Sequence, residues 1–316
     1  MNADGVQTLV LGAGWRGLLG ALRSRRERPE ASLAVLEAAP HPGGSIRTLR
    51  TNGFVCELGP FAFPRAEIEP ALALLQRAPP LVDALPGAAV GMLFTGDALA
   101  PIAVDPAPVS FRTGAEEFVQ ACRRELGDAL RLGRAATAIR PDRDGWSVDL
   151  GGEVPSTLRT QRLLVALPIA TAAHLLAPLD PALAASAERL QKSERAFAFF
   201  GGHAGDAPEL RGHGILPAEG LETPLAEAIF CTQVFAGRAL PGRFLVRCEL
   251  GGPTAGDDAS LLAVAEAELR RWTGLRCALP FQKLHRFLVE EQDAARVECR
   301  VRLAGLAARA PGLTML

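Results

Sequence analysis

The chain has 316 residues, 48% of them hydrophobic, and its 34 basic and 35 acidic residues give a net charge of −1. A mean hydropathy of +0.15 together with this near-neutral charge excludes an intrinsically disordered chain. The charge balance also argues against nucleic acid or an anionic membrane as an electrostatic partner. The length predicts about two domains.

The N-terminal residues, the longest apolar stretch and the cysteines together favour a cytoplasmic protein. Met1–Asp4 lead directly into an apolar strand without a basic segment, so we expect no secretion signal. The longest apolar stretch, residues 163–179, contains Pro168 and Pro178, so we expect no transmembrane segment. The six cysteines form no Cys-x-x-Cys pair and are typical of buried, reduced thiols.

Apolar periodicity predicts a βαβ unit at the start of the chain, with a strand at 8–11, a helix at 17–25 and a strand at 33–37. Further helices are expected at 67–77, 114–126, 170–176, 181–190, 260–272 and 296–309. Further strands are expected at 92–104 and 136–150, each as a hairpin, and at 163–167, 196–200, 228–235, 243–250, 283–288 and 311–316. The second half is therefore richer in strands, and no linker separates the two halves.

A glycine-rich turn follows the first strand. Gly12-Ala13-Gly14-Trp15-Arg16-Gly17 has the G-x-G-x-x-G spacing in which the glycines allow a tight turn, a close approach to a diphosphate and close packing of helix on sheet. Glu37 ends the second strand, where its carboxylate is expected to accept hydrogen bonds from a ribose. The motif predicts a dinucleotide site and does not by itself separate NAD from FAD.

A second glycine pair favours FAD. Gly43 and Gly44 follow Glu37 and Ala38 after a short turn, whereas the chain of an NAD-dependent dehydrogenase ordinarily continues into a crossover helix. The extra backbone amides are expected to face the diphosphate and the flavin. A plain turn is the alternative interpretation of this pair.

These motifs resemble the protoporphyrinogen oxidase family, within the FAD-dependent amine oxidase superfamily. Glu57-Leu58-Gly59-Pro60 is similar to the E-x-G-P segment whose backbone lies near the flavin, and Ala136 begins a stretch similar to the strand that meets the adenine. Ala166 lies in an apolar strand that ends in A-x-P, as in the family. Weaker similarities are seen at 111–114, 212–217 and 251–252.

The resemblance implies an α/β fold in which a Rossmann-like FAD-binding domain is interleaved with a smaller, sheet-rich α+β substrate domain. Residues 1–60, 111–170 and 291–316 are expected to build the discontinuous dinucleotide-binding domain. Residues 61–110 and 171–290 are expected to build the substrate-type domain. The implied cofactor is FAD, and the implied partner is a small-molecule substrate.

The chain also departs from the family. His41 stands where the family has an arginine, and the family's long helical insertion, which forms much of the substrate cavity, is absent from residues 61–110. The family continues beyond the equivalent of Pro311-Gly312-Leu313 into a segment that faces the flavin. We therefore expect FAD binding to be weak, or to be completed by a partner subunit or a second copy of the chain.

The candidate cofactor-binding residues share a position on a glycine turn or at the end of a strand that resembles the family's. They are Gly12, Gly14, Trp15, Arg16, Gly17, Glu37, Ala38, Gly43, Gly44, Gly59, Pro60, Ala136 and Ala166. No histidine has metal-ligating spacing, so no metal site is predicted. No catalytic side chain is identified, since a flavin can itself accept hydride.

Three functions follow as hypotheses. The first is an FAD-dependent oxidase or dehydrogenase that removes hydride from a porphyrinogen-like or other cyclic substrate. The second is a non-catalytic relative that keeps the fold as a binding or regulatory subunit. The third is an NAD(P)-dependent reductase, which the Gly43-Gly44 pair disfavours.

Overall fold

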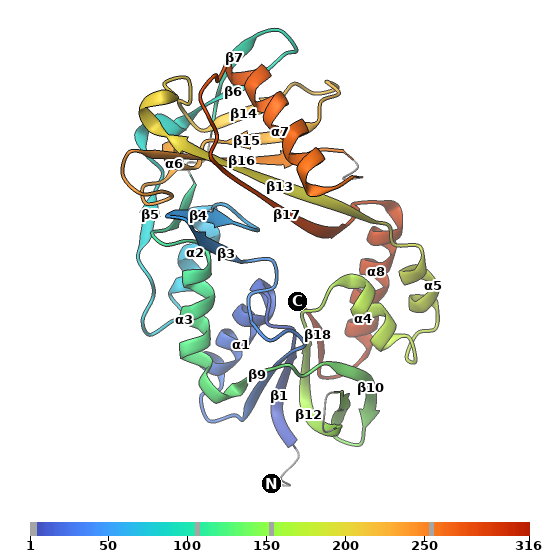
Figure 1. Cartoon of the computed structure of the whole chain (residues 1–316). Helices are drawn as coiled ribbons and strands as arrows, with labels where there is room; N and C mark the ends of the chain where they lie inside the picture. The colour runs from blue at the N-terminus through green and yellow to red at the C-terminus, as the bar shows by residue number, and fades with distance from the viewer. Residues whose placement is uncertain (1–4, 105–107, 152–154, 253–255) are drawn as a thin grey trace.

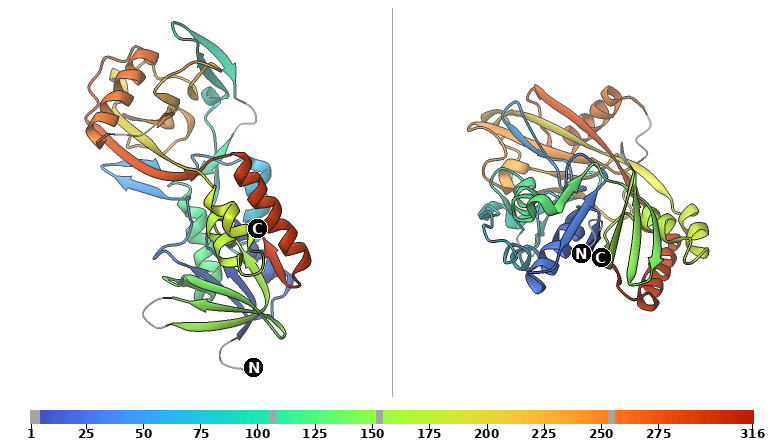
Figure 2. Two further views of the ribbon diagram at one scale, coloured as in Figure 1. Left: turned by 90° about the vertical axis from the view of Figure 1, so that its right-hand side faces the viewer. Right: turned by 90° about the horizontal axis from the view of Figure 1, so that it is seen from below.

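The computed structural model describes residues 5–104, 108–151, 155–252 and 256–316. Two seven-stranded sheets dominate it, one at each end of an elongated molecule (Figures 1 and 2). Met1–Asp4, on which the expectation about a secretion signal depends, lie outside the described residues. No described helix is both long and apolar enough to cross a membrane.

The first sheet has the order β10-β11-β12-β1-β2-β9, and β18 pairs with the half of β12 that β11 does not cover. Its strands are β1 Gly5–Leu11, β2 Leu33–Glu37, β9 Leu130–Leu132, β10 Ala136–Asp142, β11 Gly145–Leu150, β12 Ser156–Val165 and β18 Leu313–Met315. β1 is parallel to both β2 and β12. The carboxyl ends of these parallel strands therefore meet at one edge, where open α/β sheets bind ligands.

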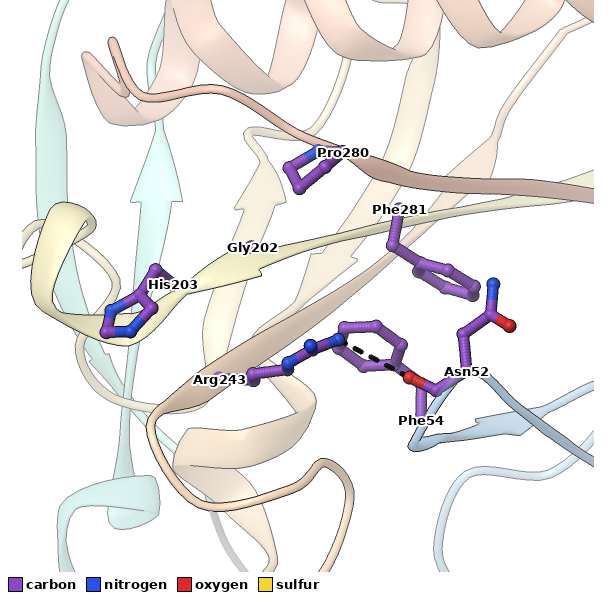
Figure 3. A pocket seen from close by; sticks show the side chains of 7 residues that line it. All are labelled: Asn52, Phe54, Gly202, His203, Arg243, Pro280 and Phe281. Atoms are coloured by element: carbon purple, nitrogen blue, oxygen red, sulfur yellow. Dashed lines mark hydrogen bonds between the residues drawn. The ribbon is translucent and has the colours of Figure 1, made fainter.

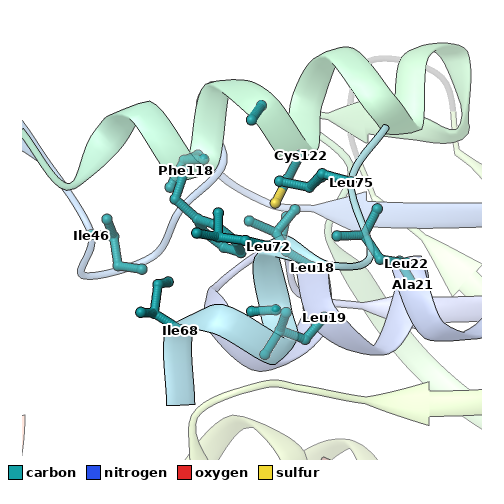
Figure 4. Packing of buried hydrophobic residues seen from close by; sticks show 14 of the residues in the cluster. Leu18, Leu19, Ala21, Leu22, Ile46, Ile68, Leu72, Leu75, Phe118 and Cys122 are labelled. Atoms are coloured by element: carbon teal, nitrogen blue, oxygen red, sulfur yellow. The ribbon is translucent and has the colours of Figure 1, made fainter. Parts of the chain in front are cut away.

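Helices cover both faces of the first sheet (Figure 1). Val10 and Val35 pack against one set of helices, and Leu9 and Leu11 pack against the other, because side chains alternate along a strand. The first set is α1 Trp15–Glu27, α2 Arg65–Leu72 and α3 Glu116–Leu126, and the second is α4 Ile169–Leu176, α5 Ala182–Glu188 and α8 Ala294–Arg309. Figure 4 shows side chains of the first set interleaving in the core.

The second sheet has the order β17-β13-β16-β15-β14-β6-β7. Its strands are β6 Val90–Phe94, β7 Leu99–Ala103, β13 Lys192–His203, β14 Gly214–Pro217, β15 Leu225–Ile229, β16 Arg243–Leu250 and β17 Phe281–Glu290. Helix α7, Asp258–Thr273, covers its outer face, and Phe200 and Val246 point toward this helix. Its inner face carries Phe197 and Phe199.

Small elements fill the space between the two sheets. The hairpin of β3 Thr48–Thr51 and β4 Phe54–Glu57 packs against the inner face of the second sheet. The remaining short elements are β5 Leu81–Asp83, β8 Val109–Phe111, α6 Cys231–Val234 and the 3₁₀ helices η1 Pro86–Ala89, η2 Gly127–Ala129 and η3 Ala204–Asp206.

The structure confirms the predicted α/β fold class, with residues 163–165 in the same sheet as the first strand. The strands predicted at 163–167 and 196–200 are longer than expected, Ser156–Val165 and Lys192–His203, and two other predicted elements end well before their predicted residues. The strand expected at 228–235 ends at Ile229, because the chain turns into the short helix α6. The helix expected at 67–77 ends at Leu72, although Pro79 and Pro80 predicted a later stop.

The predicted domain boundaries stay a prediction. Packing places α2 with α1 and α3, while β6 and β7 belong to the second sheet, so residues 61–110 contribute to both halves. Likewise α4 and α5 pack on the first sheet beside α8. The chain therefore crosses between the two halves more often than the sequence pattern indicates.

Candidate functional site

The glycine turn lies where β1 ends and α1 begins. Gly12 has a φ of +93°, and a Cβ there would lie 2.5 Å from the carbonyl oxygen of Ala166. A Cβ on Gly17 would lie 1.8 Å from the carbonyl oxygen of Gly12. Gly12 and Gly17 are thus required by the fold itself, and Ala166 closes the back of the turn.

Gly14 has a different role, since a Cβ there would meet only the Cα of Gly44, at 3.9 Å. It is the N-cap of α1, no side chain caps the helix, and the first turn contains no acidic residue. The amide groups and the helix dipole at this terminus are therefore available to an anion. This geometry fits the diphosphate of a dinucleotide.

The second glycine pair lies directly beside the first turn. The Gly43 amide donates to the carbonyl of Ala13 at 2.8 Å, and Gly14 and Gly43 form a parallel bridge. Gly43 and Gly44 have φ values of +113° and +58°, a region that favours glycine. The two turns together present backbone to one ligand position.

Glu37 braces this arrangement. One carboxylate oxygen accepts a hydrogen bond from the Ala13 amide at 2.7 Å, and the other accepts from the Ala39 amide at 2.9 Å. The carboxylate is thereby held at the end of β2, with lone pairs left for further donors. That the Glu37 carboxylate accepts hydrogen bonds from a ribose stays a prediction.

The adenine side of the predicted site is built by the chain entering β10. The Gly133 amide donates to Ala39 and the Arg134 amide donates to Glu37, at 3.1 and 2.8 Å. Ala136 follows two residues later, so this predicted residue lies on the Glu37 side of the turn. The predictions did not include Arg134, and no sequence motif marks it.

Three other predicted residues contribute less through their side chains. The Trp15 ring packs against Phe63 and Phe118, with centroids 5.6 and 4.8 Å apart, so only its backbone faces the turn. Arg16 reaches the carbonyl of Leu316 at 3.4 Å. Ala38, between Glu37 and Ala39, is exposed, and so is His41.

Gly59 joins the glycine turns to the second sheet. A Cβ on Gly59 would lie 1.8 Å from the carbonyl of Ser45, the residue after Gly44. The Gly59 carbonyl accepts a hydrogen bond from Nη1 of Arg247 on β16, at 2.8 Å. Pro60, the next residue, is exposed.

Arg247 is 5% exposed and is held from three sides. Its Nη2 donates to Oε1 of Glu227 at 2.8 Å, and its guanidinium lies 4.4 Å from the ring centroid of Phe197 and 5.4 Å from that of Phe61. Among the residues that the structure describes, the buried Nε atom has no hydrogen-bond partner. Sequence reasoning missed this residue, and the signal was a single arginine within an otherwise apolar strand segment.

A second buried arginine supports the same segment. Arg238 is fully buried between Phe61 and Phe235, at 5.7 and 5.3 Å from their ring centroids. Its Nη1 lies 3.3 Å from Oε1 of Glu57, and its Nη2 donates to the Ser110 hydroxyl at 2.6 Å.

Glu57 is also buried and accepts hydrogen bonds from Thr48 and from the Ala115 amide. Burial raises the pKa of Glu57 and lowers the pKa of Arg238, and in each case the partner's charge opposes the shift. The pair therefore ties the Glu57–Pro60 segment to the second sheet.

No group of three or more histidine, cysteine, aspartate or glutamate side chains within the described ranges could hold a metal ion. The uncapped helix terminus, the open approach at Gly14 and the carboxylate at Glu37 together fit a dinucleotide.

Comparison with known proteins agrees with this geometry. Residues 10–78 match a family described as an NAD(P)-binding Rossmann-like domain, and residues 86–290 match flavin containing amine oxidoreductases. Coproporphyrinogen III oxidase of Staphylococcus aureus is 35% identical over 54 residues, which are 17% of this chain and 12% of that protein. The aligned segment is thus a small part of that relative.

Solved structures extend the similarity in fold to the whole chain. A protein of Exiguobacterium sp. 255-15, provisionally named a protoporphyrinogen oxidase, has a TM-score of 0.80 at 15% identity and covers 100% of this chain and 94% of its own. Reduced UDP-galactopyranose mutase has a TM-score of 0.74 at 12% identity, with 98% and 89% covered. Because the flavin family matches more than half of the chain, the protein belongs to the flavin containing amine oxidoreductases, and its cofactor is FAD.

Proposed function

We propose that this flavin-dependent oxidoreductase removes hydride from a porphyrinogen-like cyclic substrate. The observation that carries the proposal is the Arg247–Gly59 contact, which sets the aromatic inner face of the second sheet beside the glycine turns. Bound FAD supplies the acceptor for the hydride. The porphyrinogen class is supported by the resemblance of the motifs and by the matching segment of coproporphyrinogen III oxidase.

The cofactor's diphosphate would be held by the backbone of the two glycine turns and by the N-terminus of α1. Glu37 would accept hydrogen bonds from the ribose. Gly59, fixed between Ser45 and Arg247, would keep the Glu57–Pro60 backbone at the flavin side. These contacts bind and orient the cofactor.

The inner face of the second sheet would position the substrate. Phe197 and Phe287 have ring centroids 4.6 Å apart, and His285 is the cross-strand partner of Phe197 on the same face. Flat apolar surface of this kind suits a macrocycle. Arg195 lies on this face two residues before Phe197, beside Glu249 and Glu291.

His285 is the titratable group that we assign to proton transfer. Burial, and then the charge of Arg47, lowers its pKa, so its ring is neutral at pH 7 and an unprotonated nitrogen can accept a proton. The carbonyl of Arg47 accepts a hydrogen bond from the Leu58 amide, and this contact places Arg47 and His285 beside the Gly59 segment. Oxidation of a porphyrinogen breaks a carbon–hydrogen bond with loss of hydride and releases an N–H proton, and His285 would take that proton.

The test is anaerobic mixing of the FAD-loaded protein with coproporphyrinogen III and, separately, with putrescine, a linear amine. We expect the absorbance of oxidised flavin to fall with the porphyrinogen and to stay unchanged with putrescine. His285→Gln should keep bound FAD and slow the bleaching by about 10²-fold. Bleaching by the amine alone would contradict the substrate class, and bleaching by neither compound would favour the non-catalytic relative.

A cytoplasmic setting is part of the proposal, and it is supported by the free state of all six cysteines. Completion of the flavin site by a partner subunit or by a second copy stays a prediction. Sedimentation of the protein with and without FAD tests it. A change in mass on adding FAD is the expected result.

A further inference from the structure

A row of side chains crosses the inner face of the second sheet, opposite the face that α7 covers. Glu249 on β16 and His285 on β17 are the cross-strand partners of Phe197 on β13, one on each side of it. Residues paired directly across strands share a face of the sheet. The row therefore places a carboxylate and an imidazole on backbones about 9–10 Å apart, which is two strand spacings.

This row lies beside the segment that we assign to the flavin. Arg247 precedes Glu249 by two residues on β16, so both side chains are on the same face of the sheet. Nη1 of Arg247 donates to the Gly59 carbonyl at 2.8 Å. A substrate bound next to the flavin would therefore be within reach of Glu249.

The cavity at the other end of this sheet offers a ligand less (Figure 3). Phe54 and Phe281 line it, but their rings are buried and stack on each other, with centroids 4.3 Å apart. The guanidinium of Arg243 lies 5.7 Å from the Phe54 centroid. These side chains cover one another, so the polar groups beside Gly59 are the better candidates for contact with a ligand.

The charged groups beside Gly59 are unequally satisfied. Glu227 is the cross-strand partner of Glu249, and its carboxylate accepts a hydrogen bond from Nη2 of Arg247 at 2.8 Å. Glu249 accepts no hydrogen bond from the residues that the structure describes, and Nη1 of Arg195 lies 3.8 Å from its Oε1. Burial, and then the charge of Glu227, raises the pKa of Glu249. This carboxylate, whose side chain is 24% exposed, therefore lacks the donors that water would supply.

Neutral N–H groups fit the Glu249 carboxylate better than a cation does. Arg195 and Arg247 already balance the charges of Glu227 and Glu249, so a bound ammonium ion would add an unbalanced charge. A pyrrole N–H donates a hydrogen bond without bringing a full charge. In a flexible ring of linked pyrroles, the N–H groups can turn to one face and converge on a single acceptor.

We propose that Glu249 recognises the substrate by accepting hydrogen bonds from its pyrrole N–H groups, an assignment that rests on the proposed porphyrinogen class. Glu249 would bind the nitrogen side of the ring from β16. His285, on the far side of Phe197, would stand where an N–H proton leaves. A ring without these donors would leave the carboxylate covered and unpaired, and this cost is the source of the specificity.

The experiment measures binding without turnover. The FAD-loaded protein is reduced with dithionite under nitrogen, so that its flavin accepts no hydride, and is titrated by calorimetry with coproporphyrinogen III. The comparison ligand is the N-methyl derivative of the same porphyrinogen, in which a methyl group replaces one N–H hydrogen. The unaltered chain should bind the N-methyl derivative at least about tenfold more weakly.

Two variants assign this preference to Glu249. Glu249→Leu removes the acceptor, so it should weaken binding of coproporphyrinogen III by about 10- to 100-fold and bind both ligands equally. Glu249→Gln keeps an acceptor without the charge, so a preference of about threefold should remain. The matched control is Glu291→Gln, because Glu291 also lies 3.8 Å from Arg195 but follows the end of β17 and accepts a hydrogen bond from Ser193. It should bind both ligands like the unaltered chain.

Three results would overturn the assignment of Glu249. They are equal binding of the two ligands by the unaltered chain, a preference that Glu249→Leu retains, or an equal loss in Glu291→Gln, which would show that the effect acts through Arg195. Any of these, together with bleaching of the oxidised flavin by coproporphyrinogen III, would leave the proposed reaction intact. Binding that depends on Glu249 without bleaching would instead contradict the reaction alone. Absence of binding of either ligand would overturn both the assignment and the substrate class.

Discussion

Two regions position the backbone on the cofactor side of the molecule, the glycine turns and the junction around Gly59. The first does so through residues without side chains, and the second through buried charged side chains. At the turns, Gly12, Gly14 and Gly17 act by lacking a side chain, so that backbone meets backbone or remains open to a ligand. At the junction, Arg238 and Arg247 are charged side chains taken out of water and paired with a carboxylate or a backbone carbonyl from another part of the chain. Binding by backbone leaves a local pattern in the sequence, whereas binding by buried charges leaves none.

The largest expected effect comes from breaking the buried pair at the junction. Arg238→Met should lower the free energy of unfolding by about 3–5 kcal/mol, because the buried Glu57 carboxylate loses its counter-charge. Urea denaturation followed by circular dichroism measures this. The double variant Arg238→Met with Glu57→Gln should recover part of the loss, since no charge is then left unpaired.

A matched surface pair sharpens that result. Arg65 also pairs with a glutamate, Glu69, but both side chains are about half exposed, so Arg65→Met should cost only about 0–1 kcal/mol. If Arg238→Met is no more costly than Arg65→Met, the junction does not depend on the buried pair.

The next effect separates ligand binding from folding at the glycine turn. Gly14→Ala should weaken FAD binding by about 10- to 100-fold, because the added methyl group stands where the diphosphate must approach. Stability should be unchanged, since the methyl group meets no protein atom closer than 3.9 Å. Fluorescence titration of FAD and thermal unfolding give the two values.

Gly87→Ala is the control, because a Cβ at Gly87 has nothing within 4 Å and the residue lies away from the turn. It should change neither value. Equal FAD affinity in the Gly14 and Gly87 variants would place the diphosphate elsewhere.

The same contrast explains what could be predicted from the sequence. The fold class and the glycine residues of the turn were accessible because a strand, a G-x-G-x-x-G turn and a helix are consecutive. The β3–β4 hairpin was missed although Asn52-Gly53 is a strong turn signal, and both residues do have positive φ.

The partners of the buried arginines could not be predicted. Arg247 meets Gly59 and Arg238 meets Ser110 across more than a hundred residues of sequence, and no local pattern encodes such pairs. The end of β15 at Ile229 was missed for a related reason. Residues 228–235 are apolar throughout, and only their tertiary packing separates the strand from α6.

The smallest expected effect concerns a titratable group in the second sheet. Burial lowers the pKa of His213, whose backbone joins Val90 and Phe230. The unfolded chain therefore binds a proton more readily than the folded chain, and stability is lost as pH falls from about 6.5 toward the lowered folded value. The pKa of His285 is lowered as well, so His285 adds to the dependence of stability on pH.

His213→Gln should reduce the loss of unfolding free energy between about pH 7 and pH 5, and adding His285→Gln should reduce that loss further. Urea midpoints measured across that range test this. A slope that both replacements leave unaltered would show that these two half-buried histidines do not set the acid stability.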